Sequence, residues 1–313
     1  MRNTGSGSWL SASTWDTGTI PTASNTVDIG PKAGSIVELD GTGAAANLHV
    51  FDQLDLVSGS LGVGGIGKGA VGLVEVSGVM NLDAASQLTA GDLKISDGGL
   101  VQDDGLVVLR GLPSGKAPGL LNFSGTINVS GELRDFNGFR NDKDGLLVAT
   151  GHADFFPIGD TGVAAINAGK IEALDGGLIQ FEGALRGNGS LIVDRGEIDV
   201  FGSAADGGGA RLVGEASTLK LLGGGSVDVQ FVGINDQLFL GRSLQYKGSI
   251  SGFATGDKID VLDQAFNAAL DSYNPKTHTL AVGSTEIKIV GTYKASDFTF
   301  ASDLHGGTLI GHV

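Results

Sequence analysis

The chain has 313 residues, of which 54 are glycine, 6 are proline and none is cysteine. Its apolar content of 41% can form a core, which excludes a disordered chain, and the lack of cysteine excludes disulfide scaffolds and thiolate metal sites. The net charge of −15 disfavours nucleic acid and anionic membrane surfaces as partners, because their phosphates are repelled. No apolar run reaches the ~18 residues of a membrane span, so we predict no membrane insertion.

Residues 1–25 contain both tryptophans, Trp9 and Trp15, and are predicted to form an N-terminal cap segment over the first strands. The first eight residues lack the apolar stretch of a secretory signal. At this point a cytosolic chain, a fragment, and a chain exported through its C-terminal end all stay open.

Residues 26–250 read as very short strands in which apolar and polar residues alternate, as at 27–29, 54–56 and 198–200. Alternation of this kind indicates strands with one buried and one exposed face. Glycine, asparagine, aspartate and serine separate the strands, whose centres recur every ~6 to 11 residues, closer than in most sandwiches and barrels. The pattern predicts an all-β fold, a right-handed parallel β-helix (β-solenoid) that forms a single elongated rod with ~20 residues per coil. A β-propeller is the alternative, although no aromatic motif recurs at blade spacing.

Two segments interrupt this rhythm. Residues 134–160 carry four phenylalanines and are predicted to leave the solenoid as an extended loop. Residues 265–270 are predicted to form one helical turn that ends before Pro275. Residues 251–313 are predicted to be a C-terminal closing β module continuous with the rod, with strands at 280–282, 287–290, 298–300 and 308–310, the last of which shows no evident cap.

Both ends of the chain resemble a known group of proteins. Residues 9–21 (WLSASTWDTGTIP) and 27–29 (VDI) are similar to the start of repeats in bacterial autotransporter passenger domains. Residues 249–261 (SISGFATGDKIDV), 293–298 and 301–310 resemble the closing module of large secreted or surface proteins of Gram-negative bacteria. The resemblance covers about a quarter of the chain. It implies a right-handed parallel β-helix, export and an adhesin-like or structural role at the cell surface, and it supplies no catalytic residues. The chain departs from the full family in having no signal peptide and no outer-membrane barrel.

Three patterns have features of chemical sites. Residues 62–67 match G-x-G-x-x-G, but a strand pattern follows where phosphate binding needs a helix. Asp142 and Asp144 precede Gly145 like a fragment of a calcium loop, so they are weak calcium ligand candidates, with Asp154 or Asp160 as further donors. Calcium is the one cofactor that the sequence suggests. The third pattern gathers acids and arginines that a glycan-cleaving β-helix would carry on one face: Glu172, Glu182, Arg186, Asp194, Arg195, Glu197 and Asp199.

The sequence therefore predicts a non-enzymatic extracellular or cell-surface β-solenoid, acting as an adhesin or as a self-assembling structural protein. Its expected partners are further copies of itself or a surface glycan. The alternative is a polysaccharide-acting β-helix, a lyase or hydrolase.

Overall fold

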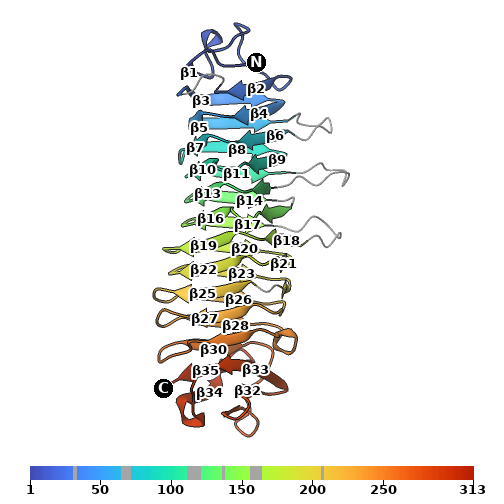
Figure 1. Ribbon diagram of the computed structural model, residues 1–313, viewed down its shortest axis with the longest axis vertical. Helices are drawn as coiled ribbons and strands as arrows, with labels where there is room; N and C mark the ends of the chain where they lie inside the picture. Colours follow the sequence, from blue (N-terminus) through green and yellow to red (C-terminus); the bar gives the residue numbers. More distant parts are fainter. Residues whose placement is uncertain (31–33, 65–71, 111–120, 136–137, 156–163, 206–207) are drawn as a thin grey trace. The chain divides into compact units, whose positions relative to one another are not determined.

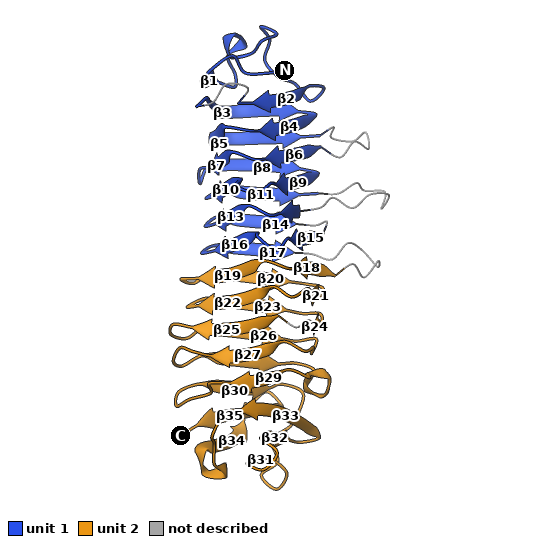
Figure 2. Ribbon diagram, viewed as in Figure 1, with its two compact units in different colours: residues 1–163 blue, residues 164–313 orange. Residues whose placement is uncertain are grey.

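The computed structural model describes residues 1–30, 34–64, 72–110, 121–135, 138–155, 164–205 and 208–313. The chain divides into two compact units, unit 1 (residues 1–163) and unit 2 (residues 164–313), which Figure 2 distinguishes by colour. Each unit consists of short strands joined by tight corners, and the described ranges contain no α-helix. No helix in these ranges is therefore long and apolar enough to cross a membrane.

Unit 1 is built from successive coils with three strands each, and each strand pairs in parallel with its counterparts in the neighbouring coils (Figure 1). The first face consists of β2 (Thr26–Ile29), β4 (Asn47–Val50), β6 (Leu73–Val76), β9 (Asp92–Ile95), β12 (Leu121–Phe123) and β15 (Phe139–Asn141). The second face consists of the first halves of β3 (Ile36–Ala45) and β5 (Gln53–Val63), then β7 (Val79–Leu82), β10 (Leu100–Asp103), β13 (Thr126–Val129) and β16 (Leu146–Ala149). The third face consists of the second halves of β3 and β5, then β8 (Ser86–Ala90), β11 (Leu106–Leu109), β14 (Glu132–Asp135) and β17 (His152–Phe155).

Unit 2 repeats this plan with three faces of its own. Its first face consists of β18 (Ala165–Asn167), β21 (Leu185–Arg186) and β24 (Ala204–Ala205). Its second face consists of β19 (Lys170–Leu174), β22 (Ser190–Asp194), β25 (Gly209–Val213), β27 (Asp228–Phe231) and β29 (Ser249–Ser251). Its third face consists of β20 (Leu178–Phe181), β23 (Glu197–Val200), β26 (Thr218–Leu221), β28 (Gln237–Leu240) and β30 (Lys258–Val261).

The pairing confirms the predicted parallel β-solenoid in both units. Val79 lies opposite Leu100, and Leu191 lies opposite Ala210, so each of these coils takes up about as much chain as the sequence spacing predicts. No closed barrel occurs among the described strands. Since strands of the same face pair in register from coil to coil, residues at equivalent positions form ladders along the unit.

Alternation along each strand places one ladder of side chains in the core. On the first face of unit 1 the inward ladder consists of Val27, Leu48, Val74, Leu93, Leu121 and Phe139, all of which are buried. Burial of each such side chain stabilises the fold by about 1.5–3 kcal/mol relative to an exposed one. Stacked apolar ladders of this kind therefore hold the coils together.

The predicted loop over residues 134–160 is wrong in its described part. Strands β14 to β17 continue the coils without interruption. Phe139 and Phe155 point into the core with ring centroids 4.5 Å apart, and the ring of Phe123 lies 5.6 Å from that of Phe139. The aromatic side chains are thus core residues, stabilised by edge-to-face packing, and do not mark an extended loop. Phe136 and Phe156 lie outside the described residues.

The turn predicted over 265–270 occurs two residues further along the chain, as one hydrogen-bonded turn that begins at Asn267. The backbone N–H of Asp271 donates to the Asn267 carbonyl at 2.9 Å, and strand β31 (Ser272–Asn274), which the sequence pattern did not predict, follows directly. Tyr273 anchors this strand because its ring is buried.

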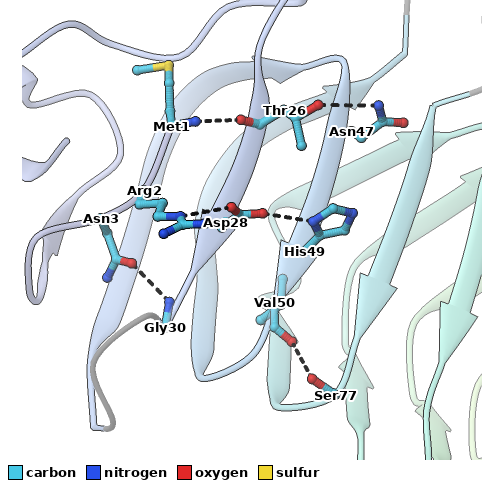
Figure 3. Close-up of polar contacts among 10 residues, drawn as sticks. All are labelled: Met1, Arg2, Asn3, Thr26, Asp28, Gly30, Asn47, His49, Val50 and Ser77. Atoms are coloured by element: carbon cyan, nitrogen blue, oxygen red, sulfur yellow. Dashed lines mark hydrogen bonds and ion pairs between the residues drawn. The ribbon is translucent and has the colours of Figure 1, made fainter. Parts of the chain in front are cut away.

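Residues 1–8 close the amino-terminal end of unit 1. The Met1 ammonium donates to the Thr26 carbonyl at 2.8 Å, and the Asn3 side chain accepts the N–H of Gly30 at 2.9 Å (Figure 3). Strand β1 (Gly7–Ser8) pairs with β3 on the second face. These contacts lie next to the buried Trp9 and so cover part of the first coil, as an extra strand would.

The carboxyl end of unit 2 is closed by antiparallel strands, so the expectation that residues 308–310 lack a cap is wrong. Strand β33 (Thr285–Val290) continues the second face in parallel with β29 and pairs with β32 (Thr279–Val282) in antiparallel orientation. Strand β35 (Thr308–His312) runs antiparallel to both β30 and β34 (Phe298–Ser302). On the second and the third face, the last strand pairs with an antiparallel neighbour, and this ends the parallel stacking of coils.

Candidate functional site

A groove of about 670 Å³ lies on the third face of unit 1. The strand register shows which residues of the groove are neighbours. Thr42 of β3 lies opposite Ser60 of β5, which lies opposite Gln87 of β8. At the ~4.8 Å spacing of neighbouring strands, this outward ladder of two hydroxyls and one amide extends over ~10 Å.

Small residues form the outward ladder next to this one. Ala44, Gly62 and Thr89 occupy equivalent positions in successive coils. In the next coil Val108 lies opposite Thr89, and Leu106 lies opposite Gln87 of the hydroxyl and amide ladder. Leu106 and Val108 have larger side chains than the residues opposite Ala44 and Gly62. The small residues therefore form the floor of the groove, and β11 forms its edge.

Arg110 lies at this end of the groove. It follows β11 directly, and its backbone N–H donates to the carbonyl of Ala90 at 2.9 Å, which fixes its position relative to β8. Its side chain is exposed. The groove therefore offers hydroxyl and amide groups along its length and a guanidinium at one end.

These polar groups are available to a ligand. Within the part of the chain that the structure describes, the side chains of Thr42, Ser60, Gln87, Thr89 and Arg110 have no hydrogen-bond or ion-pair partner. The described lining residues include no aspartate, glutamate, histidine or lysine. The volume is typical of ligand sites, and the described polar lining can donate and accept hydrogen bonds.

A second polar cluster lies on the third face of unit 2. Lys220 of β26 forms ion pairs with Glu197 and Asp199 of β23, its Nζ atom lying 3.4 Å from Asp199 Oδ2. Gln180 Nε2 donates to the same oxygen at 3.1 Å. Burial, and secondly the charge of Glu197, raises the pKa of Asp199, while these carboxylates raise the pKa of Lys220 against the effect of its burial.

Glu197 and Asp199 lie close together in this cluster, because both form ion pairs with Lys220. The next outward carboxylate in the ladder is Asp260, whose pKa burial raises to about 6. It lies three coils from Asp199, with Lys220 and Phe239 between them. Three coils correspond to ~14 Å, whereas catalytic carboxyl pairs lie about 5–9.5 Å apart.

Of the other predicted acid and arginine candidates, the structure brings Asp194 and Arg195 into contact but not Glu172, Glu182 and Arg186. Arg195 bridges successive coils, with Nε 2.9 Å from Asp175 Oδ1 and Nη1 3.0 Å from Asp194 Oδ1. Glu172 pairs with Lys170 on the second face of unit 2, while Arg186 lies on the first face. Glu182 is exposed at the corner after β20. The candidates thus occupy different faces and do not converge on one groove.

The weak calcium candidates lie in the turn between β15 and β16. The Asp142 carboxylate is 2.8 Å from Arg140 Nε, and its carbonyl accepts the N–H of Gly145 at 2.9 Å. Asp144 is exposed in the same turn, and Asp154 faces His152 on the third face. Among the described residues no group of three or more acidic or histidine side chains could hold a metal ion, and Asp160 lies outside them. Calcium binding here stays a prediction.

The glycine pattern at 62–67 contributes to the groove. Strand β5 continues to Val63, and Gly62 and Gly64 line the groove. Strand β6 follows, so the described residues after the pattern form a strand as expected, without the helix that phosphate binding needs. Residues 65–71 lie outside the described part.

Sequence reasoning missed the groove. The available signal was the succession of small outward residues, Ala44 and Gly62, beside Thr42 and Ser60. It becomes visible once the strands are aligned, because the two members of each pair belong to different coils. Comparison with protein-family models, curated proteins and solved structures gave no match.

Proposed function

We propose that this chain is a non-enzymatic extracellular β-solenoid of the adhesin type, which binds a glycan in the groove on the third face of unit 1. One observation carries the proposal: the groove presents five polar side chains without partners and, in its described lining, no acid or base for catalysis. Such a lining can hydrogen-bond a ligand that carries many hydroxyl groups.

The pairing of the floor strands favours a glycan over a peptide. Strand β5 pairs with β3 on one side and with β7 and β8 on the other, so its backbone groups are already engaged. An extended peptide gains affinity mainly by adding to an open strand edge. A ligand on this floor must instead be recognised through side chains, which suits sugar hydroxyls.

The alternative function is cleavage of a polysaccharide. The cluster of Glu197, Asp199 and Lys220 is its best remaining site, because it combines carboxylates with an amine. The ion pairs within this cluster and the large separation from Asp260 weigh against it. A self-assembling fibre is a further alternative, and the closed carboxyl end of unit 2 weighs against stacking of coils through that end.

The groove can be tested with a filling variant. A Cβ atom added at Gly62 would meet no heavy atom within 4 Å, so Gly62→Phe fills the groove without disturbing the fold. Gly209→Phe is the matched control, since a Cβ there has only one neighbour, the Asp228 carbonyl oxygen at 3.9 Å. Both proteins and the wild type are applied to an array of oligosaccharides, and product release from bound glycans is measured.

We expect the wild type and Gly209→Phe to bind the same glycans without cleaving them, and Gly62→Phe to lose at least ~10-fold in affinity, about 1.4 kcal/mol. Absence of any glycan binding by the wild type would overturn the proposal. Cleavage that Asp199→Asn abolishes would establish the enzymatic alternative. Filaments seen by electron microscopy, without glycan binding, would establish the fibre.

A further inference from the structure

We infer that the glycan of this groove is a carboxylated one, a polyuronate-like chain, and that Arg110 binds a sugar carboxylate. The inference rests on the proposed function and goes beyond it, because it assigns the charge of the ligand and the residue that recognises it. It begins from the ion pairs of unit 1.

Most described lysine and arginine side chains of unit 1 have a carboxylate partner. Arg2 pairs with Asp28 at 3.4 Å, Lys94 with Glu75 at 2.6 Å, Arg134 with Glu132 at 2.5 Å and Arg140 with Asp142 at 2.8 Å. The two exceptions among the described residues of this unit are Arg110 and Lys143. Lys143 lies in the exposed turn after β15, whereas Arg110 lies in the groove.

The guanidinium of Arg110 has no carboxylate partner among the described residues, although the whole chain has 35 acidic and 20 basic residues. Arg186, Arg211 and Arg242 of unit 2 are also without such a partner, but only Arg110 lies among the described residues that line the groove. The guanidinium group matches the geometry of a carboxylate and can donate two parallel hydrogen bonds to it. Because the described lining contributes no competing acid, the side chain of Arg110 is free to meet an external carboxylate.

The arrangement of the other polar groups indicates what else the ligand carries. Gln87 and Thr89 lie one coil from Leu106 and Val108 of the strand that Arg110 follows, and Thr42 lies two coils further. Gln87 and Thr89 therefore lie ~5 Å along the unit from the coil of Arg110, and Thr42 lies ~14 Å from it. A ligand that uses both parts has a carboxylate at one position and hydroxyl groups over several sugar units.

A phosphate-rich polymer fits less well. Both polymers carry a charge at every repeat and are repelled by a chain of net charge −15. A polyuronate also carries hydroxyl groups on every sugar, which the hydroxyl and amide side chains of the groove can hydrogen-bond. The lining thus favours the glycan through its hydroxyl groups.

The test compares polyuronate oligosaccharides with the same oligosaccharides after reduction of their carboxyl groups, which makes them neutral. Binding to each form is measured by calorimetry with the wild type, Arg110→Gln, Arg110→Lys and Lys143→Gln. Lys143→Gln is the matched control, because Lys143 is the other lysine or arginine without a carboxylate partner among the described residues of unit 1, and its removal changes the net charge equally. Both side chains are exposed, so the variants should keep the wild-type circular dichroism spectrum and melting temperature.

We expect the wild type and Lys143→Gln to prefer the carboxylated form at least ~10-fold, with a preference that falls as salt is added. Arg110→Gln should bind both forms like the neutral one, and Arg110→Lys should keep part of the preference. Equal binding of both forms by the wild type, or an unchanged preference in Arg110→Gln, would overturn the inference and leave glycan binding intact. Failure of both forms to bind would overturn the inference together with this glycan class as the ligand, and if the oligosaccharide array is also negative, the proposed function falls with it.

Discussion

Asp103 is the last residue of β10 and points into the core of unit 1, where Leu82 and Val129 occupy the equivalent positions of the neighbouring coils. Its Oδ1 atom accepts the N–H of Gly105 at 3.0 Å, and its Oδ2 atom is buried without a hydrogen-bond partner. Burial raises the pKa of Asp103 to about 7. The ionised carboxylate is therefore disfavoured in the folded state.

The raised pKa of Asp103 makes the free energy of unfolding depend on pH. Since the pKa is about 7 in the folded state and near 3.8 in the unfolded state, the stabilising effect of protonation is complete below pH ~4 and is lost as the pH rises towards 7. Asp103→Asn keeps the acceptor for Gly105 and cannot ionise. We expect it to raise the free energy of unfolding by about 2 kcal/mol at pH 8 and to have little effect at pH 4.

Urea unfolding at four values between pH 4 and pH 8 measures this difference. Asp83→Asn is the control, because Asp83 is exposed at the same corner one coil earlier. An effect of Asp103→Asn that is the same at both ends of the range would show that the buried charge is not its cause.

At the level of the elements, one corner of unit 2 repeats a single backbone conformation. Two residues before each strand of its third face, from β20 to β30, the chain has a positive φ angle: 91° at Gly176, 57° at Arg195, 58° at Ala216, 58° at Asn235 and 97° at Gly256. Glycine adopts this conformation readily, whereas other L-residues incur a cost of roughly 1–2 kcal/mol. The fold requires the conformation whichever residue is present.

Ala216→Gly should therefore stabilise unit 2. Glycine removes the cost of the left-handed conformation, and this effect is larger than the entropy that glycine adds to the unfolded chain. We expect the free energy of unfolding to rise by about 0.5 kcal/mol. Ala205→Gly is the matched control, because φ is not positive at Ala205 in β24, and we expect it to lose about 0.5–1 kcal/mol. Chemical unfolding of both variants provides the measurement, and a loss of stability in Ala216→Gly would contradict the argument.

The same corner shows what the sequence could and could not predict about the elements. Glycine at residues 176 and 177 identified the turn before β20, but Arg195 and Ala216 carry no such signal, since neither residue favours a positive φ. The strands themselves could be predicted from alternation, because Ile198 and Val200 are buried while Glu197 is partly exposed. Strand β31 was missed because only one of its three residues, Tyr273, is apolar and buried.

At the scale of the whole molecule, the amino-terminal end depends on its two tryptophans. The rings of Trp9 and Trp15 are both buried, with centroids 5.2 Å apart, and Trp15 Nε1 donates to the Trp9 carbonyl at 2.9 Å. They cover the apolar residues of the first coil. Without them the inward ladders of unit 1 would end in contact with water.

Trp9→Ala should lower the free energy of unfolding of unit 1 by about 3–5 kcal/mol, and Trp9→Phe by less, because the ring still fills part of the space. Thermal unfolding followed by circular dichroism measures the loss. Leu10→Ala is the control on the neighbouring, exposed side chain. A similar melting temperature for Trp9→Ala and Leu10→Ala would show that Trp9 does not close this end.

The β-solenoid could be predicted from the sequence, whereas the groove could not, and the reason lies in coil length. Thr42, Ser60 and Gln87 occupy equivalent positions in successive coils, but the chain from Ser60 to Gln87 is considerably longer than the chain from Thr42 to Ser60. A repeat of fixed length does not align these three side chains. Whether they become neighbours depends on the number of residues in each corner. That number cannot be predicted from the local pattern of apolar and polar residues.

Coils of unequal length that keep the same register also have a consequence for how such a chain can change over time. The chain from Gln53 to Val79 is longer than the chain from Val79 to Leu100, yet both pairs lie in register and the ladders that they join do not change. Residues can therefore be gained or lost at a corner while the core stays constant. The length of a corner can thus diverge between related chains, or be altered by grafting, independently of the scaffold that carries it.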